Sequence, residues 1–225
     1  IKKTISLVAD FAPGHDIEKA FEEFFTKAGG QLMEKVRVPL RNPDFSPFLQ
    51  RIADAKPDAL FVFTPAGMGA QFMKQYVERG LDKSGIKLIA TGDVTDDDVL
   101  NGMGDVALGV ITAHHYSANH QSPENKKFVE GYAKVSNGGR PNFMGAGGYD
   151  GIHLIYEALK KTNGNTDGDT LVNAMKGMKW TSPRGPMMID PATRDVIQNV
   201  YIREVKKVDG QLYNVELATF ENVKD

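Results

Sequence analysis

The chain has 225 residues, 41% of them hydrophobic, enough to bury the core of one large domain or two small ones. Its formal net charge of -2 provides no broad positive field for the phosphates of nucleic acid, so we expect no nucleic-acid partner. The absence of cysteine excludes disulfides, thiolate metal sites and cysteine nucleophiles, and no apolar run is long enough for a membrane span.

The first half of the chain alternates apolar, β-rich runs with amphipathic helical patterns. We expect five strands, at residues 5–9, 34–38, 59–63, 86–90 and 108–112. Between the first four, we expect helices at residues 17–28, 45–55 and 68–79. Alternation of this kind predicts βαβ units and a doubly wound parallel sheet with helices on both faces.

After Thr112 the pattern becomes helical, with helices expected at residues 123–135, 145–161 and 169–176 and no sheet of their own. The second of these has an apolar face that needs a partner layer, made of Ile152, Leu154, Ile155, Ala158 and Leu159. Near the end, residues 196–206 and 211–220 flank Asp209 and Gly210, which predicts a β-hairpin.

A candidate ligand site follows the strands of the first half. The first strand ends at Asp10 and turns through Pro13 and Gly14 into a helix. Open α/β sheets bind ligands where strand ends meet helix N-termini, so this turn predicts one wall of a crevice. Asp93 follows a later strand at the same edge, while residues 96–98 are interpreted as a helix cap.

Motifs for enzyme chemistry are only approximate. The segment GMGAQF, residues 67–72, approaches a dinucleotide fingerprint but has Phe72 in place of the third small residue, which favours a simple glycine-rich turn. His114, His115 and His120 raise a zinc hypothesis, but adjacent histidines on a strand point to opposite faces. We therefore expect no catalytic residues, no metal and no cofactor.

Four segments together resemble a known family. They are DFAPGHD, PLRNPDFSPFLQRI, GYDGIHLIYEAL and SPRGPMMIDPATRDVIQNVYIREV. They resemble the branched-chain amino-acid-binding (leucine/isoleucine/valine-binding) family of ABC-importer solute-binding proteins, which have the type I periplasmic binding fold. The resemblance covers essentially the whole chain. Members of that family begin with a complete N-terminal lobe, whereas this sequence opens at what resembles the second lobe, so it looks like a fragment.

This resemblance implies two lobes. Residues 1–115 and 183–225 would form the second ligand-binding lobe, and residues 116–182 the helical portion of the first lobe without its N-terminal sheet. Hinges would lie near Tyr116 and Ser182. The apolar face of the helix at residues 145–161 would then be uncovered, which predicts self-association.

The resemblance also implies a function. The protein would be a non-enzymatic, periplasmic binding protein that holds an amino acid or aromatic carboxylate in an inter-lobe cleft and delivers it to the permease of an ABC transporter. Asp93 would bind a ligand ammonium, or Phe11 and Tyr116 would stack on an aromatic ligand. The expected ligand contacts are Asp10, Phe11, Ala12, Pro65, Ala66, Gly67, Asp93, Thr95 and Tyr116.

Two alternatives stay open. The first is a nucleotide-dependent α/β enzyme that uses GMGAQF as a degenerate phosphate turn. The second is a cytoplasmic amide or amino-acid sensor with the same binding fold.

Overall fold

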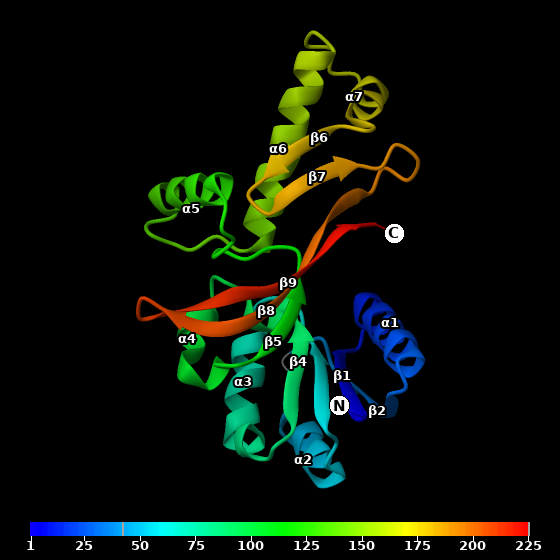
Figure 1. The fold of residues 1–225 in the computed structure, drawn as a ribbon, viewed down its shortest axis with the longest axis vertical. Helices are drawn as coiled ribbons and strands as arrows, with labels where there is room; N and C mark the ends of the chain where they lie inside the picture. Colours follow the sequence, from blue (N-terminus) through cyan, green and yellow to red (C-terminus); the bar gives the residue numbers. More distant parts are fainter. Residues whose placement is uncertain (42, 225) are drawn as a thin grey trace. The chain divides into compact units, whose positions relative to one another are not determined.

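The structure is a computed structural model that describes residues 1–41 and 43–224. Asn42, within the second family-like segment, and Asp225, the end of the expected second lobe, lie outside the described residues. The chain divides into two compact units, which Figure 1 shows in sequence colours. Unit 1 comprises Ile1–Ala113 and Glu204–Leu212, and unit 2 comprises His114–Arg203 and Tyr213–Asp225. The chain therefore passes from one unit to the other three times.

Unit 1 is the expected doubly wound layer. Its parallel strands follow the order β2-β1-β3-β4-β5. The strands are β1 (Lys3–Ala9), β2 (Gln31–Val38), β3 (Ala59–Phe63), β4 (Lys87–Thr91) and β5 (Ile111–His114). The helices are α1 (Ala12–Lys27), α2 (Ser46–Ala55), α3 (Gly69–Glu78) and the short α4 (Leu100–Met103), with 3-10 turns η1 (Leu81–Lys83), η2 (Gly92–Thr95) and η3 (Gly104–Ala107).

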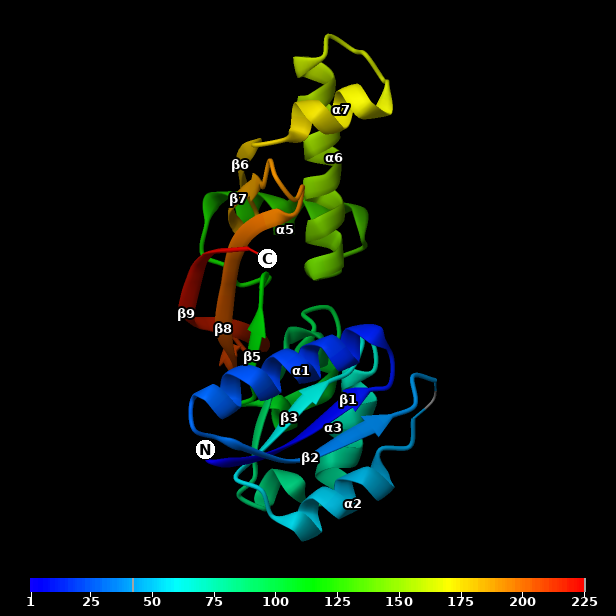
Figure 2. The same ribbon diagram turned by 90° about the vertical axis from the view of Figure 1, so that its right-hand side faces the viewer.

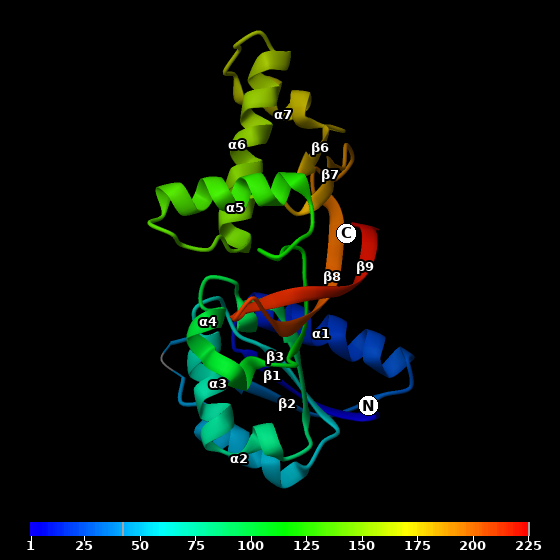
Figure 3. The same ribbon diagram turned by 60° about the vertical axis from the view of Figure 1, so that its left-hand side comes forward.

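Side chains of β3 alternate between the two helical layers, as the period of two in a strand requires. Phe61 stacks on Phe21 of α1, with ring centroids 4.0 Å apart. Leu60 and Val62 belong instead to the main core, which includes residues of α2 and α3. Figures 2 and 3 show α1 on one face of this sheet and α2 and α3 on the other. The fold class predicted from the alternating pattern is confirmed.

The fifth strand differs from its expected range. It runs over Ile111–His114, because residues 104–107 form a 3-10 turn and Gly109 has a positive φ of 79° that interrupts an extended strand. Leu108, expected inside the strand, is 42% exposed. The apolar run was therefore a poor guide to the boundary of this strand.

Unit 2 contains the three expected helices, α5 (Pro123–Val135), α6 (Phe143–Lys161) and α7 (Gly168–Met175). It also contains an antiparallel pair, β6 (Lys179–Ser182) and β7 (Gly185–Ile189), which follows the helices and which the sequence did not predict. Both strands are short, and they are joined by a turn in which Gly185 has a φ of 102°. Four- and five-residue strands give little periodicity in a sequence.

The final two strands form the expected hairpin. They are β8 (Val196–Val208) and β9 (Gln211–Val223), which pair with each other. Asp209 and Gly210 both have positive φ, 49° and 80°, as a two-residue type I′ turn requires. Within unit 1, the Val205 N–H donates to the Val110 carbonyl at 3.0 Å beside β5, and within unit 2, β8 pairs with β7.

The compact units do not follow the expected lobe boundaries throughout. The first crossing lies after Ala113, two residues before the expected boundary. Residues 183–203 group with the helices of unit 2 rather than with unit 1, because β7 pairs with β6 on one side and β8 on the other. The assignment of residues to lobes of a larger protein remains a prediction.

The apolar face of α6 is only partly covered. Ala158 is buried and Leu154 and Leu159 are partly buried, whereas Ile152 and Ile155 are 51% and 41% exposed. No helix among residues 1–41 and 43–224 is long and apolar enough to cross a membrane.

Candidate functional site

Eight of the nine predicted contact residues follow three neighbouring strands of unit 1. Because β1, β3 and β4 are adjacent and parallel, their carboxyl ends lie at one edge of the sheet. We call this the strand-end edge. Its residues are Asp10, Phe11 and Ala12 after β1, Pro65, Ala66 and Gly67 after β3, and Asp93 and Thr95 after β4.

The turn after β1 is built for close packing. Phe11 is the extended N-cap residue of α1, and its ring stacks on Phe63 at the end of β3, with centroids 5.9 Å apart. A Cβ at Gly14 would lie 2.0 Å from the Ala9 carbonyl oxygen, so only glycine lets the first turn of α1 approach the strand this closely. The half-buried Phe11 ring is thus held in a fixed place at the edge.

Asp10 is the first charged group at the strand-end edge. Its carboxylate lies 2.7 Å from Nε2 of His15, and both side chains are substantially exposed. His15, in the first turn of α1, therefore lies beside this acidic group.

The loop after β3 explains the glycines of GMGAQF. Gly67 has a φ of 90°, and a Cβ at Gly69 would lie 2.0 Å from the carbonyl oxygen of Val94. Gly69 thus allows the start of α3 to pack against the loop after β4. This requirement for close backbone packing supports the glycine-rich turn interpretation over a phosphate loop.

The loop after β4 carries the acidic candidates. Asp93 is half-buried in η2, and Thr95, in the same turn, is fully buried. The interpretation of residues 96–98 as a helix cap is wrong, because α4 begins at Leu100 and its N-cap residue is Val99, which provides no side-chain cap. Asp96 instead accepts the Asp97 N–H on Oδ1 at 3.0 Å.

Two buried hydroxyls at the strand ends lack partners within the described residues. They are Oγ1 of Thr64, directly after β3, and Oγ1 of Thr91, the last residue of β4. Buried polar atoms are usually hydrogen-bonded in folded proteins. The strand-end edge therefore has unused hydrogen-bonding capacity that the sequence did not reveal.

The ninth predicted contact, Tyr116, lies in unit 2 and is fully buried there. Its hydroxyl donates to Oδ1 of Asn125 at 3.2 Å, and its carbonyl accepts a hydrogen bond from Arg203. Its ring packs against Phe128 in a second core cluster with Ala118 and Ala146. In this structure Tyr116 is a core residue of unit 2, and its role as a ligand contact remains a prediction.

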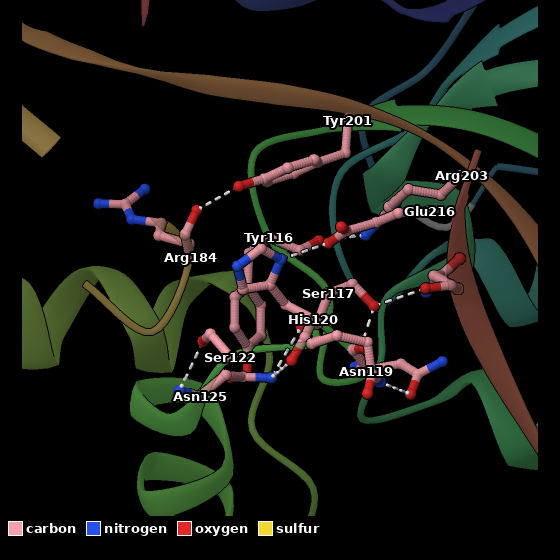
Figure 4. A network of polar contacts seen from close by, with 12 residues as sticks. Tyr116, Ser117, Asn119, His120, Ser122, Asn125, Arg184, Tyr201, Arg203 and Glu216 are labelled. Carbon is pink, nitrogen blue, oxygen red and sulfur yellow. Dashed lines mark hydrogen bonds and ion pairs between the residues drawn. The ribbon is translucent and has the colours of Figure 1, made fainter. Parts of the chain in front are cut away.

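Hydrogen bonds hold the segments beside the three crossings together within unit 2 (Figure 4). Oγ of Ser117 donates to the carbonyl of Asn214 at 2.6 Å, and Nδ1 of His120 lies 2.8 Å from Oε1 of Glu216. The Tyr201 hydroxyl donates to the carbonyl of Arg184 at 2.7 Å. The sequence reasoning missed this network, because its partners are about 20 to 100 residues apart.

The histidine-rich segment does not form a metal site of the usual kind. His120 is bonded to Glu216, and the described residues contain no group of three histidine or carboxylate side chains that could hold a metal ion. The expectation that His114 and His115 point to opposite faces is wrong: β5 ends at His114, and the two rings stack with centroids 4.3 Å apart.

A doubly wound parallel sheet with loops gathered at its carboxyl edge, in a chain that crosses three times between two units, is typical of α/β proteins that bind ligands at strand ends. A family model described as periplasmic binding protein matches residues 1–211. The chain belongs to the periplasmic binding protein family.

Two relatives match this chain along its whole length. A Leu/Ile/Val-binding protein homolog 6 from Brucella abortus is 48% identical over 100% of this chain and 58% of its own length. A solute-binding protein of an ABC transporter from Rhodopseudomonas palustris BisB5, solved with 3,4-dihydroxybenzoic acid, is 64% identical with a TM-score of 0.97. The match covers 100% of this chain and 62% of that one.

A second Rhodopseudomonas palustris protein, from strain HaA2, was solved with p-hydroxybenzoic acid. It is 44% identical with a TM-score of 0.92, and the match covers 98% of this chain and 61% of that one. The chain thus spans about three fifths of the length of these relatives.

Proposed function

We propose that this chain is part of the solute-binding component of an ABC importer and that its ligand is a small hydroxylated aromatic carboxylate. The observation that carries this proposal is the 64% identity, over the full chain, to a solute-binding protein solved with 3,4-dihydroxybenzoic acid. The 44% identical relative solved with p-hydroxybenzoic acid supports the same ligand class. The partner that receives the ligand would be the permease of the transporter, and the compartment would be the periplasm.

The strand-end edge offers suitable chemistry for such a ligand. Phe11, held against Phe63, provides an aromatic face for stacking. Asp93 is an acceptor for a ligand hydroxyl, and the loop at Gly67 brings backbone groups to the same edge. The remaining proposed contacts at this edge are Asp10, Ala12, Pro65, Ala66 and Thr95. Tyr116, a core residue of unit 2, is also a proposed ligand contact.

A second ligand class is a branched-chain amino acid. The name of the Brucella relative, at 48% identity, favours it. Asp93 would then bind the ligand ammonium, since a carboxylate is the natural partner of that group. The two ligand classes make opposite predictions for hydroxybenzoates, which have no ammonium group. An aromatic-acid site would bind them, and an amino-acid site would not, so a binding experiment separates the two classes.

The enzyme alternative has less support, because Gly69 is explained by its packing against Val94 and the family consists of solute-binding proteins. A cytoplasmic sensor would share the fold, and the coding sequence upstream of Ile1 would separate it from a transport component.

The test is thermal unfolding of the 225-residue chain against 3,4-dihydroxybenzoate, 4-hydroxybenzoate, leucine and ATP. A ligand that binds only the folded state raises the unfolding midpoint. We expect a concentration-dependent rise with the hydroxybenzoates and none with leucine or ATP. Asp93→Asn should weaken binding of hydroxylated benzoates more than binding of benzoate itself. A rise with leucine alone would transfer the proposal to amino acids, and a rise with ATP alone would overturn it.

A further inference from the structure

Two stacked histidines open unit 2 and take no part in the network of Figure 4. His114 is 9% exposed, and its ring lies against His115 and against the ring of Phe143, at centroid distances of 4.3 and 4.6 Å. Nδ1 of His114 is buried and has no hydrogen-bond partner within residues 1–41 and 43–224. Because unpaired buried polar atoms are rare in folded proteins, this nitrogen needs an explanation.

The surroundings of these rings favour negative charge. Phe143 is the first residue of α6, which is 19 residues long, so the histidines lie against the N-terminal turn of a long helix. A helix N-terminus carries partial positive charge and N–H groups without partners in the helix. Asn142 caps one of them, accepting the Gly145 N–H on Oδ1 at 3.0 Å.

Two nearly buried arginines add to the positive potential. Arg184 and Arg203 are 8% and 2% exposed. Burial first, and then the charges of these arginines, hold the pKa of His114 well below its usual value and lower the pKa of His115 to about 3. Both imidazoles are therefore neutral near pH 7, and each has one N–H to donate. Arg184 is itself paired with Asp150, at 2.8 Å, and Arg203 donates to the Tyr116 carbonyl.

We propose that His114, His115 and the N-terminal turn of α6 form a carboxylate-binding subsite in unit 2. This inference rests on the proposed function, because the carboxylate would be that of the aromatic acid. Neutral imidazoles can donate to a carboxylate without the cost of burying a further positive charge. The helix N-terminus and the two arginines supply the attraction, and Phe143 supplies an apolar surface beside the carboxylate for the ring of the acid.

The ordinary alternative is that the pair only fills the core at the start of unit 2, with an ordered water at the unpartnered nitrogen. This alternative makes a different prediction. A core histidine replaced by phenylalanine would alter stability but would not change the preference between a charged ligand and its uncharged analogue.

The experiment compares the dissociation constants of 3,4-dihydroxybenzoate and 3,4-dihydroxybenzamide by calorimetry. The ratio of the two constants measures the selectivity for a carboxylate over a carboxamide. The variants are His114→Phe and His115→Phe, which keep an aromatic ring but lose the nitrogens, and His114→Asn, which keeps a donor near Nδ1. The matched control is His153→Phe, in α6 of the same unit, where the ring lies 6.2 Å from that of Trp180.

We expect His114→Phe or His115→Phe to lower the acid-to-amide selectivity by roughly tenfold to a hundredfold, the effect of one charge-assisted hydrogen bond. We expect His114→Asn to retain part of the selectivity and His153→Phe to retain all of it. If the unchanged chain binds the acid and both phenylalanine variants keep its selectivity, the subsite is refuted and the proposed function stands. If the unchanged chain binds neither compound, the proposed function fails, and the subsite fails with it.

Discussion

Asp150 of α6 and Arg184 of the β6–β7 turn form an ion pair inside unit 2, with Oδ2 and Nε 2.8 Å apart and side chains 4% and 9% exposed. The same carboxylate accepts the Ser182 hydroxyl at 2.9 Å and the Trp180 indole N–H at 3.0 Å. One buried acid thus connects the long helix to two residues of β6 and to the turn that follows it. Neither Asp150 nor Trp180 stood out in the sequence, because the residues that Asp150 joins are about 30 positions away.

Asp150→Ala should destabilise unit 2 strongly. The substitution leaves the Arg184 guanidinium buried without its counter-ion, which typically costs about 3–5 kcal/mol of unfolding free energy. Urea unfolding followed by fluorescence measures this effect directly, because Trp180 is the single tryptophan of the chain. Glu23→Ala, which breaks an exposed pair with Lys27, is the control and should leave the midpoint unchanged. Equal midpoints for the two variants would contradict the structural importance of the buried pair.

Gly14→Ala should destabilise unit 1. The new methyl group would meet the Ala9 carbonyl oxygen at 2.0 Å, so α1 must move away from the end of β1, at an expected cost of about 1–3 kcal/mol. Circular dichroism during urea unfolding provides the measurement. Gly131→Ala, within α5, has no atom near the new methyl and should instead stabilise by about 0.5–1 kcal/mol. A neutral effect at Gly14 would mean that the turn after β1 is looser than the structure indicates.

Acid should destabilise unit 2 through its two stacked histidines. Their folded-state pKa values are lowered, that of His115 to about 3, from an unfolded value of 6.5, so the unfolded chain binds more protons between these limits. The stabilising contribution is therefore complete above about pH 6.5 and is lost as the pH falls toward 3. As the pH falls through that window, each histidine that stays neutral in the folded state should lower the free energy of unfolding by about 1.4 kcal/mol per pH unit.

The check is a series of urea unfolding curves between about pH 7 and about pH 5, within the window set by these pKa values. The double variant His114→Phe/His115→Phe removes both titrating groups and should show a visibly smaller loss of stability over that range. An identical pH dependence in the unchanged chain and the double variant would show that the two histidines bind protons equally in the folded and unfolded states, which would contradict the lowered pKa values.

The exposed apolar face of α6 should cause self-association. Met144, Ile152 and Ile155 are 63%, 51% and 41% exposed and recur at helical spacing on one side of the helix. Contiguous apolar surface of this kind commonly mediates association. Sedimentation velocity should show a mass that rises with concentration, and Ile152→Glu should reduce it, whereas Lys160→Glu, beyond these positions on the same helix, should not. A monomer at every concentration tested would refute this prediction.

Unit 1 was predicted well because its helices, strands and turns are determined by residues close together in the sequence. Strand and helix patterns alternate within short segments, and the Asp209–Gly210 turn specifies its own geometry. The position of eight contact candidates at one edge followed from the parallel order of β1, β3 and β4 alone. The stacking of the half-buried Phe11 on the buried Phe63 at this edge was not predicted, because it depends on contact between residues about 50 positions apart.

Unit 2 was harder to predict because tertiary contacts decide its structure. Strands β6 and β7 are too short to show a period, and they are stabilised by Asp150 from a distant helix. The stacking of His114 on His115 is possible because β5 ends at His114, whereas the expectation of opposite faces had placed both histidines on a strand.

The three crossings also have a consequence for biosynthesis. The edge of the sheet in unit 1 is completed by Glu204–Leu212 and unit 2 by the residues from Tyr213 onward, so both units depend on the last tenth of the chain. A ribosome must therefore synthesise the chain through Leu212 before unit 1 can close its core, and past Tyr213 before unit 2 can do so. Until then the nascent chain is incompletely folded and accessible to chaperones and proteases. Premature termination near the Asp209–Gly210 turn would leave both units incomplete, not just one of them.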